Sequence, residues 1–211
     1  MRLAPEGRII VLPLMVFNAL AIWQANELEI PMIIPWILIM LLVFCLNFFR
    51  DPIRYIPEGD DLVLAPADGK IVKIEKIQDE DLGESQLVSI FLNVFNVHAN
   101  RMPIHGTFSK VEYEKGKFLA AFDHKASDEN ERTEILLNSK FGMIKIKQIA
   151  GLIARRILCY AKKGETMDAG ERLGFIRFGS RTDLILPIHV NLSVELGQKV
   201  IGNTTIIGTF E

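Results

Sequence analysis

The stretch GFIRFGSRTDLILP, Gly174 to Pro187, places a Gly-Ser step, Gly179–Ser180, between two apolar runs. The second run is one of many short runs rich in Val, Ile and Phe that Gly, Pro, Asp and Asn separate, and such runs predict β strands. Ser180 is not in a G-x-S-x-G motif and no strand–turn–helix pattern surrounds it, so it lacks the usual signs of a hydrolytic serine. The stretch therefore predicts a β fold and leaves the Gly-Ser step to be explained.

Residues 51–211 are predicted to form a mainly β domain. Apolar and polar residues alternate clearly in KIVKIE (70–75) and MIKIKQI (143–149), as in half-buried strands. GLIARRILCYA (151–161) is compatible with a strand or a short helix, and the polar residues 124–133 predict a loop. Further strands are predicted in DLVLAP, LVSIFLNVF, GTFSKVEYE, RTDLILP and HVNLSVELG.

Composition limits the classes of protein that fit. The length of 211 residues suggests one globular domain plus a smaller part. A formal net charge of −2 argues against nucleic acid as a partner, because nucleic-acid proteins carry basic patches. The two cysteines, Cys45 and Cys159, do not suggest a disulfide framework.

Most of the excess hydrophobicity lies in two N-terminal stretches. Ile30–Phe49 contains no charge and has the roughly 20 apolar residues that a membrane span needs. Ile9–Trp23 is shorter and contains Asn18, so it is marginal as a span. A cleaved signal peptide is disfavoured, because no small-residue cleavage site follows Trp23 and a longer apolar segment comes next.

The charges around these stretches predict their orientation. Arg2 and Arg8 precede the first stretch and Arg50 follows the second, whereas the loop between them is acidic. The positive-inside rule then places both ends in the cytoplasm. Residues 1–50 are predicted to be a helical hairpin that anchors the chain in the cell membrane, with the domain that follows on the cytoplasmic side. The alternatives are a first segment that lies in the interface, or peripheral docking of the whole region.

His98 is the strongest histidine candidate. It lies in FNVHANRMP, where an apolar strand meets polar residues, and a strand end is a rigid position for an acid or base. His98, His105, His124 and His189 form no local metal motif, so no metal is expected. Asp68 in LAPADGKIV fits a simple turn, or alternatively a carboxylate that orients an imidazole.

Two arginines are candidate anion ligands, because the guanidinium fork suits phosphate and carboxylate. Arg132 follows Asn130 and Glu131 in the polar loop, and Arg155 lies in AGLIARRI. Solvated surface charge is the competing explanation for Arg132 and Arg155.

A serine that follows glycine has one special reaction available. Its hydroxyl can attack the preceding carbonyl, which glycine leaves sterically open. The resulting backbone ester can undergo β-elimination, which breaks the chain, and hydrolysis of the product leaves a pyruvoyl group. Such a carbonyl can accept a substrate amine as a Schiff base and act as an electron sink. A Gly-Ser pair alone is weak evidence for this chemistry.

Several motifs in this order resemble the phosphatidylserine decarboxylase family in its short form. They are FFRDPIRYIP, LAPADGKIV, NVFNVHANRMPIHG, the NER triplet, AGLIARRI and GERLGFIRFGSRTDLILP. The similarity covers about residues 48–211. It implies a barrel-like β fold and self-cleavage between Gly179 and Ser180, which gives a β chain (1–179) and an α chain (180–211) that stay together.

The resemblance also implies roles for residues. Ser180 becomes the pyruvoyl cofactor, which forms a Schiff base with the amine of a serine phospholipid. His98 is expected to deprotonate Ser180 during maturation, with Asp68 orienting it. Arg101, Arg132 or Arg155 is expected to bind the lipid phosphate. Arg101 replaces a second histidine of some longer relatives, which leaves the division of labour between Asp68 and His98 open.

Two other functions compete with this interpretation. One is a membrane-anchored serine hydrolase that uses Ser180, His98 and Asp68. The other is a carrier or scaffold in which Lys125 is modified, because the PADGKIV and GQKVIGN turns are similar to those of biotinyl or lipoyl carriers. For the decarboxylase, the lipid backbone is either the diacyl type or an archaeal diether, since both carry the same head group.

Overall fold

The computed structural model describes residues 2–28, 31–116, 130–151, 156–177 and 180–211. The chain divides into two compact units, residues 1–53 and residues 54–211. The prediction placed the boundary at residue 50, directly after the second apolar stretch. Each unit is described by itself below.

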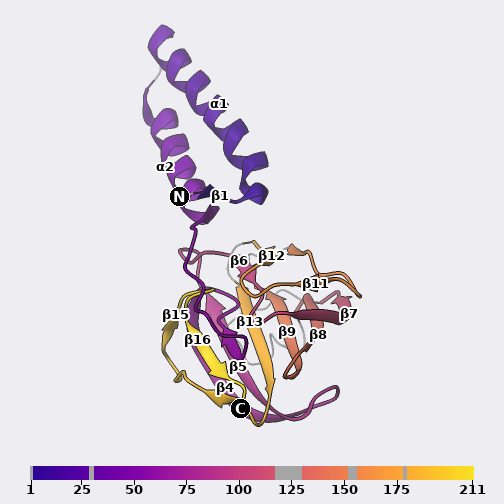
Figure 1. Cartoon of the computed structure of the whole chain (residues 1–211). Helices are drawn as coiled ribbons and strands as arrows, with labels where there is room; N and C mark the ends of the chain where they lie inside the picture. Colours follow the sequence, from indigo (N-terminus) through magenta and orange to yellow (C-terminus); the bar gives the residue numbers. More distant parts are fainter. Residues whose placement is uncertain (1, 29–30, 117–129, 152–155, 178–179) are drawn as a thin grey trace. The chain divides into compact units, whose positions relative to one another are not determined.

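The first unit is a pair of antiparallel helices, seen at the indigo end of the chain in Figure 1. Helix α1 spans Pro5–Glu27 and helix α2 spans Ile33–Phe48. The short strands β1 (Arg2–Leu3) and β2 (Arg50–Asp51) pair at the open end of the hairpin. Asn18, the polar residue of α1, donates from Nδ2 to the carbonyls of Leu14 at 2.9 Å and Leu38 at 3.2 Å. Its amide therefore joins the two helices.

The two helices differ from the predicted spans in length. Among the described helices, α1 has the length and apolar composition to cross a membrane, with 23 residues. Helix α2 has 16 residues, or roughly 24 Å, which is shorter than the hydrocarbon core of a bilayer. The sequence interpretation ranked the segments the other way, because it counted apolar residues before Ile33 that precede the helix.

The second unit contains a large antiparallel sheet of eight strands, in the order β11-β7-β8-β9-β13-β5-β4-β15. Long neighbouring strands form its centre, and β13 lies between β5 and β9 (Figure 1). The strands are β4 Gly69–Asp79, β5 Gly83–Leu92, β7 Gly106–Glu114, β8 Arg132–Ser139, β9 Gly142–Ala150, β11 Thr166–Met167, β13 Ser180–Pro187 and β15 Lys199–Val200.

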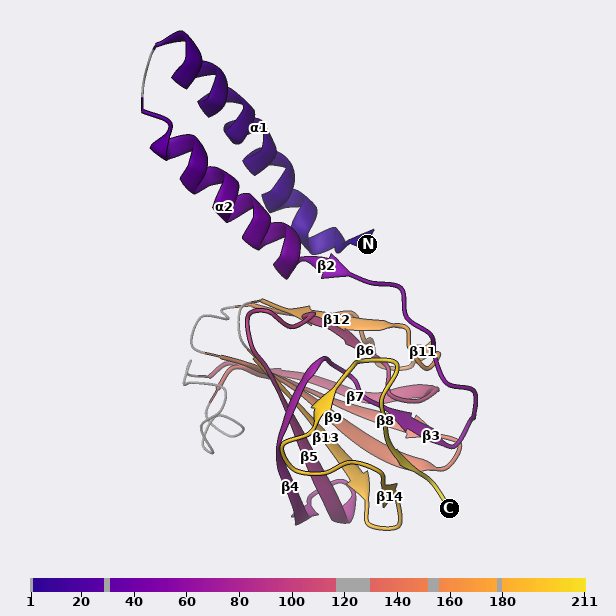
Figure 2. The same ribbon diagram turned by 90° about the vertical axis from the view of Figure 1, so that its left-hand side faces the viewer.

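Two smaller sheets complete the unit. One has the order β10-β12-β6, with β10 Ile157–Cys159, β12 Arg172–Ile176 and β6 Ala99–Arg101. The other has the order β14-β16-β3, with β14 Asn191–Leu192, β16 Ile206–Thr209 and β3 Leu62–Leu64. Strand β12 contacts β9, and Figure 2 shows β6 and β12 lying over the large sheet. The fold is mainly β as predicted, and the described strands form compact sheets without closing into a barrel.

The alternation of residues explains which face of the large sheet forms the core. On β13, Leu184 and Leu186 are fully buried in the main hydrophobic cluster. Leu184 lies opposite Val88 of β5 and Ile146 of β9, which belong to the same cluster. Because side chains two residues apart share a face, Ser180 lies at the end of this apolar row.

One predicted boundary is wrong. Residues 124–133 were expected to form a loop, but Arg132 and Thr133 begin β8. Residues 117–129 lie outside the described part of the chain. Arg132 faces the charged side of the sheet and Thr133 is buried on the other side, so their polarity did not indicate a loop.

Candidate active site

Ser180 is the first residue of β13, opposite Leu92 of β5 and Ala150 of β9. Its side chain is fully buried, and its Oγ has no hydrogen-bond partner among the described residues. Buried hydroxyl groups in folded proteins are nearly always paired, so this exception requires an explanation. The position predicted to be the cleavage site therefore holds a buried serine whose hydroxyl the described fold does not use.

His98 lies directly before β6, and β6 pairs with β12. The carbonyl of His98 accepts a hydrogen bond from Ile176 N–H at 3.3 Å, and Ile176 closes the strand that precedes Ser180 along the chain. The imidazole is fully buried and its Nδ1 lies 2.9 Å from the carbonyl oxygen of Asn96. A proton on Nδ1 directed at this carbonyl leaves Nε2 as the basic nitrogen.

Three uncharged side chains link the strand after His98 to the strand of Ser180. Asn100 of β6 donates from Nδ2 to Thr182 Oγ1 of β13 at 3.3 Å. Gln148 of β9 donates from Nε2 to Asn100 Oδ1 at 2.7 Å. All three residues are fully buried. Sequence analysis did not identify this cluster, although Asn100 lies two residues after His98 and shares its side of an extended chain.

Asp68 is held by Arg54 rather than by a described contact to His98. The two terminal nitrogens of Arg54 pair with the two carboxylate oxygens, with 2.7 Å between Nη2 and Oδ2. The N–H of Gly202 also donates to Oδ1, at 2.9 Å. The expected orientation of His98 by Asp68 stays a prediction. Arg54 was missed as a site residue, because nothing in the spacing of residues 54 and 68 indicates that they meet.

The three predicted arginines have different environments. Arg101 on β6 lies opposite Arg172 on β12 in the strand ladder. Arg101 Nη1 lies 3.5 Å from the carbonyl oxygen of Gly170, and the Arg172 guanidinium lies over the Phe175 ring. Arg132 forms ion pairs with Glu114 and, at 2.8 Å, with Glu134, so carboxylates of this chain neutralise its charge. Arg155 lies outside the described residues. Of the three, Arg101 has the best support as an anion ligand.

The remaining candidates divide into two groups. Gly179, His124 and Lys125 lie outside the described residues, so their predicted roles stay predictions. His105 is exposed and its Nδ1 lies 2.6 Å from Asp168 Oδ1, and His189 is exposed beside Phe210. Of the described histidines, His98 is the buried one.

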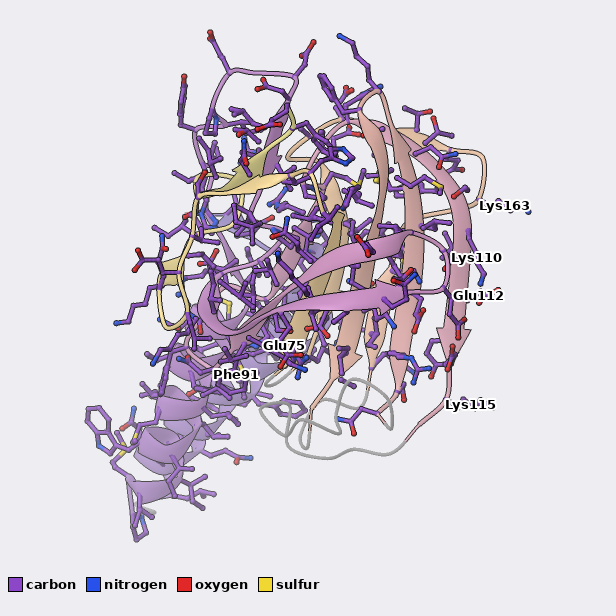
Figure 3. The ribbon with its side chains drawn as sticks, turned by 90° about the horizontal axis from the view of Figure 1, so that it is seen from below. Glu75, Phe91, Lys110, Glu112, Lys115 and Lys163 are labelled. Carbon is purple, nitrogen blue, oxygen red and sulfur yellow. The ribbon has the colours of Figure 1, made fainter. Side chains whose placement is uncertain are left out.

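The opposite face of the large sheet is charged and lines a hollow of about 480 Å³. Lys145 Nζ pairs with Asp79 at 2.7 Å and Asp81 at 2.6 Å, and Lys147 pairs with Glu134 at 2.9 Å. Figure 3 shows further charged side chains along β7, where Lys110 and Glu112 pair at 3.0 Å. These opposite charges satisfy one another, so the hollow is an ion-pair network and a weaker candidate than the buried site.

The pKa values of this network follow from the pairing. Burial alone would raise the pKa of Asp79, but hydrogen bonds from Lys145 and the backbone outweigh it and hold the pKa below its usual value. Burial would lower the pKa of Lys145, but Asp79 and Asp81 raise it above its usual value. The pKa of Glu134 is likewise lowered, because Lys147 and Arg132 outweigh its burial. Asp79, Lys145 and Glu134 are therefore charged at neutral pH.

The fold and the site define a β protein that keeps its candidate nucleophile inside the core, at the start of a central strand. Residues 41–208 match the model of the phosphatidylserine decarboxylase family. The phosphatidylserine decarboxylase proenzyme of Ehrlichia chaffeensis is 47% identical over 175 residues, which cover 81% of this chain and 77% of that protein. The proenzyme of Burkholderia cenocepacia strain HI2424 is 49% identical over 178 residues, 83% of each chain. The chain belongs to the phosphatidylserine decarboxylase family.

Proposed function

We propose that this protein decarboxylates phosphatidylserine to phosphatidylethanolamine after cutting itself between Gly179 and Ser180. The observation that carries the proposal is the buried Ser180 hydroxyl, which has no partner in the described part of a chain from this family. The relatives are named as proenzymes, which fits a chain that must be processed. The alternative, a serine hydrolase that uses Ser180, His98 and Asp68, needs no cleavage of its own chain, so self-cleavage distinguishes the two functions.

The proposed maturation uses groups of this chain. Nε2 of His98 takes the proton of Ser180 while Oγ attacks the carbonyl carbon of Gly179. The C–N bond of this peptide breaks as the C–O bond forms, and the proton passes to the freed amino group. Loss of the Cα proton of residue 180 then expels the carboxylate of Gly179. Water replaces the nitrogen of the remaining dehydroalanine, which leaves as ammonia, and a pyruvoyl group remains.

The site is suited to hold this group, because Ser180 is buried and lies opposite Leu92 and Ala150. The pyruvoyl carbonyl supplies an electrophile that takes up the substrate amine and accepts the electrons released with carbon dioxide. The buried strands around residue 180 exclude water from the substrate carbon that loses carbon dioxide. His98 is the proposed acid that protonates the substrate carbon after carbon dioxide has left.

The proposed fragments have extensive contacts that keep them together. Strand β13 begins the small α chain, and it pairs on one side with β5 and on the other with β9. Strand β15 pairs with β4, and β16 pairs with β3. Gly202, also in the α chain, bonds to Asp68 of the β chain. Cleavage at one peptide bond leaves all of these contacts in place.

Arg101 is the proposed ligand of the lipid phosphate, together with Arg172. An anion bound by both would reduce the repulsion between these like charges on adjacent strands. A phosphodiester accepts hydrogen bonds from both guanidinium groups.

The proposed location is the cell membrane with the second unit in the cytoplasm, supported by the apolar helix α1 and the flanking arginines.

The test is intact-mass spectrometry of the purified wild-type protein beside Ser180→Ala. We expect the wild type to give a fragment that begins at residue 180, with the mass of a pyruvoyl cap and no free N-terminus. The Ser180→Ala chain stays whole. Only the cleaved protein releases carbon dioxide from phosphatidylserine in detergent micelles. An intact, folded wild-type chain would refute the proposal.

A further inference from the structure

We propose that Asn100 and Gln148 are positioning residues for self-cleavage, acting through Thr182 to hold Ser180 in register with His98. The inference rests on the proposed function and goes beyond it, because it assigns a role to a buried cluster that the chemistry itself does not need. Neither amide contacts Ser180 through a described hydrogen bond. Their effect on the reaction is therefore expected to be geometric.

The cluster joins three strands from two sheets. Asn100 comes from β6 in the three-stranded sheet, and Thr182 and Gln148 come from β13 and β9 in the large sheet. Thr182 and Gln148 are directly opposite each other in the β13–β9 ladder. Asn100 thus binds across the gap between the two sheets, and Gln148 supports it from the strand beside Thr182.

The spacing along each strand transmits this contact to the reacting residues. His98 lies two residues before Asn100, and Ser180 lies two residues before Thr182. Side chains two apart on an extended chain point to the same side. The hydrogen bond between Asn100 and Thr182 therefore fixes the position of the segment that contains His98 relative to the start of β13, where Ser180 lies.

Polar burial at this place is not explained by packing. Apolar residues continue this face, with Leu184 and Ile90 next to Thr182 along and across the strands, and Thr133 of β8 lies opposite Gln148. Gln148 Oε1 is buried and has no hydrogen-bond partner among the described residues. A cluster selected only for stability would be apolar or fully paired, because unpaired buried polar atoms are costly.

Gly174 of β12 provides the space that the cluster occupies. A Cβ atom at Gly174 would lie 2.7 Å from Gln148 Nε2 and 2.2 Å from the carbonyl oxygen of Leu158. Gly174 is also the residue opposite Asn100 in the β12–β6 ladder. The strand that leads toward Ser180 thus lacks a side chain at the point where the Gln148 amide reaches Asn100.

The experiment measures the rate of self-cleavage in full-length protein made by cell-free synthesis in detergent. Thr182→Val removes the hydroxyl acceptor at nearly constant shape, and Thr182→Ser keeps it. We expect Thr182→Val, Asn100→Ala and Gln148→Leu to slow cleavage by about 10- to 100-fold, because small misplacements of reacting groups have effects of this size. Thr182→Ser should stay within about 2-fold of wild type.

Gln86→Leu is the matched control. Gln86 donates its amide to the carbonyl of Val190 at 2.8 Å, at the far end of the β5–β13 pair from Ser180. We expect it to lower the unfolding temperature without slowing cleavage. Equal cleavage rates in Thr182→Val and Thr182→Ser would overturn the inference, even if another variant failed to fold. A wild type that does not cleave would instead refute the proposed function.

Two further measurements distinguish misplacement of the reacting groups from a general loss of fold stability. If Asn100 acts through Thr182, the double variant Asn100→Ala/Thr182→Val should cleave no more slowly than the slower single variant.

Hydroxylamine reacts with the backbone ester, cutting the chain to a Gly179 hydroxamate and a free Ser180 amino group. Impaired attack leaves no ester to trap, so we expect hydroxylamine not to restore cleavage. Additive rate losses or rapid trapping would contradict a role in the attack.

Discussion

At the scale of single residues, Asp68 has both carboxylate oxygens in use. Arg54 holds them in a bidentate ion pair, and the Gly202 N–H donates to one of them. Bidentate pairs of this kind are among the stronger hydrogen-bonded contacts in proteins. If Asp68 is to orient His98 during maturation, its carboxylate must exchange Arg54 for the imidazole or bind both.

Two substitutions separate these roles of Asp68. Asp68→Asn removes the charge that would support a protonated His98, so we expect it to slow self-cleavage by at least about 100-fold. Arg54→Gln breaks the ion pair but keeps the carboxylate, so its effect should remain below about 10-fold. The fraction of cleaved chain against time measures both. Equal rates in the two variants would indicate that Asp68 serves only as the partner of Arg54.

The residues that sequence analysis identified are those with local motifs. Ser180 follows glycine in a characteristic stretch, and His98 lies where a predicted strand ends, so neither requires knowledge of the fold. Asn100, Gln148 and Arg54 acquire their meaning from partners far along the chain, such as Thr182 for Asn100. No spacing in the sequence encodes which strands cross, so these contacts could not be predicted.

At the scale of elements, ion pairs add to the strand pairing that holds the hairpin of β4 and β5 in the sheet. Asp79 at the end of β4 and Asp81 in the turn both bind Lys145 of β9. Lys145 and Asp79 are almost completely buried, with side chains 5% and 7% exposed. The lowered pKa of Asp79 stabilises the fold above the ordinary carboxyl pKa, and this contribution is lost as the pH falls through the lowered value.

Lys145→Met should therefore weaken the fold in a pH-dependent way. Removal of Lys145 leaves the buried Asp79 carboxylate and the partly exposed Asp81 carboxylate without their cation, which we expect to cost about 3 kcal/mol in the free energy of unfolding at pH 7. Without Lys145, burial raises the pKa of Asp79, so protonation relieves the penalty and the deficit shrinks toward about pH 4.5. Urea unfolding in a Ser180→Ala background, which keeps the chain whole, measures both values.

Lys147→Met is the control for this prediction. It lies on the same face of β9, but its partner Glu134 keeps Arg132. We expect a loss below about 1 kcal/mol with little change in pH dependence. A Lys145→Met deficit that stays constant between the two pH values would show that the carboxylates are not the cause.

Strands with one buried face were predicted correctly. Strand ends that depend on turns or on contacts with other charged residues were not. Alternation in residues 70–75 and 143–149 matches β4 and β9, whose apolar residues enter the core. The predicted strand in HVNLSVELG shortens to Asn191–Leu192, because the chain makes turns around it. The start of β8 was missed, since Arg132 is polar but pairs with Glu114 of β7 and with Glu134 of its own strand.

At the scale of the whole molecule, the chain joins two units with different surfaces. Residues 54–211 enclose their own hydrophobic cluster, which contains no residue of the first unit. Both helices of the first unit expose large apolar side chains, among them Trp23 of α1 and Trp36 of α2. Such surfaces are stable in lipid and unfavourable in water. We therefore infer that maturation depends on the second unit, and access to membrane lipid on the first.

A chain shortened to residues 51–211 tests this division of labour. It keeps Arg54, Asp68 and the strands around Ser180, so we expect self-cleavage within about 2-fold of the full-length rate. Its turnover of phosphatidylserine in detergent micelles should also persist. On vesicles, turnover should fall by about 10-fold or more, because the anchor no longer concentrates the site at the bilayer. Failure to cleave would mean that the helices complete the fold around Ser180, and undiminished turnover on vesicles would mean that the second unit binds the bilayer by itself.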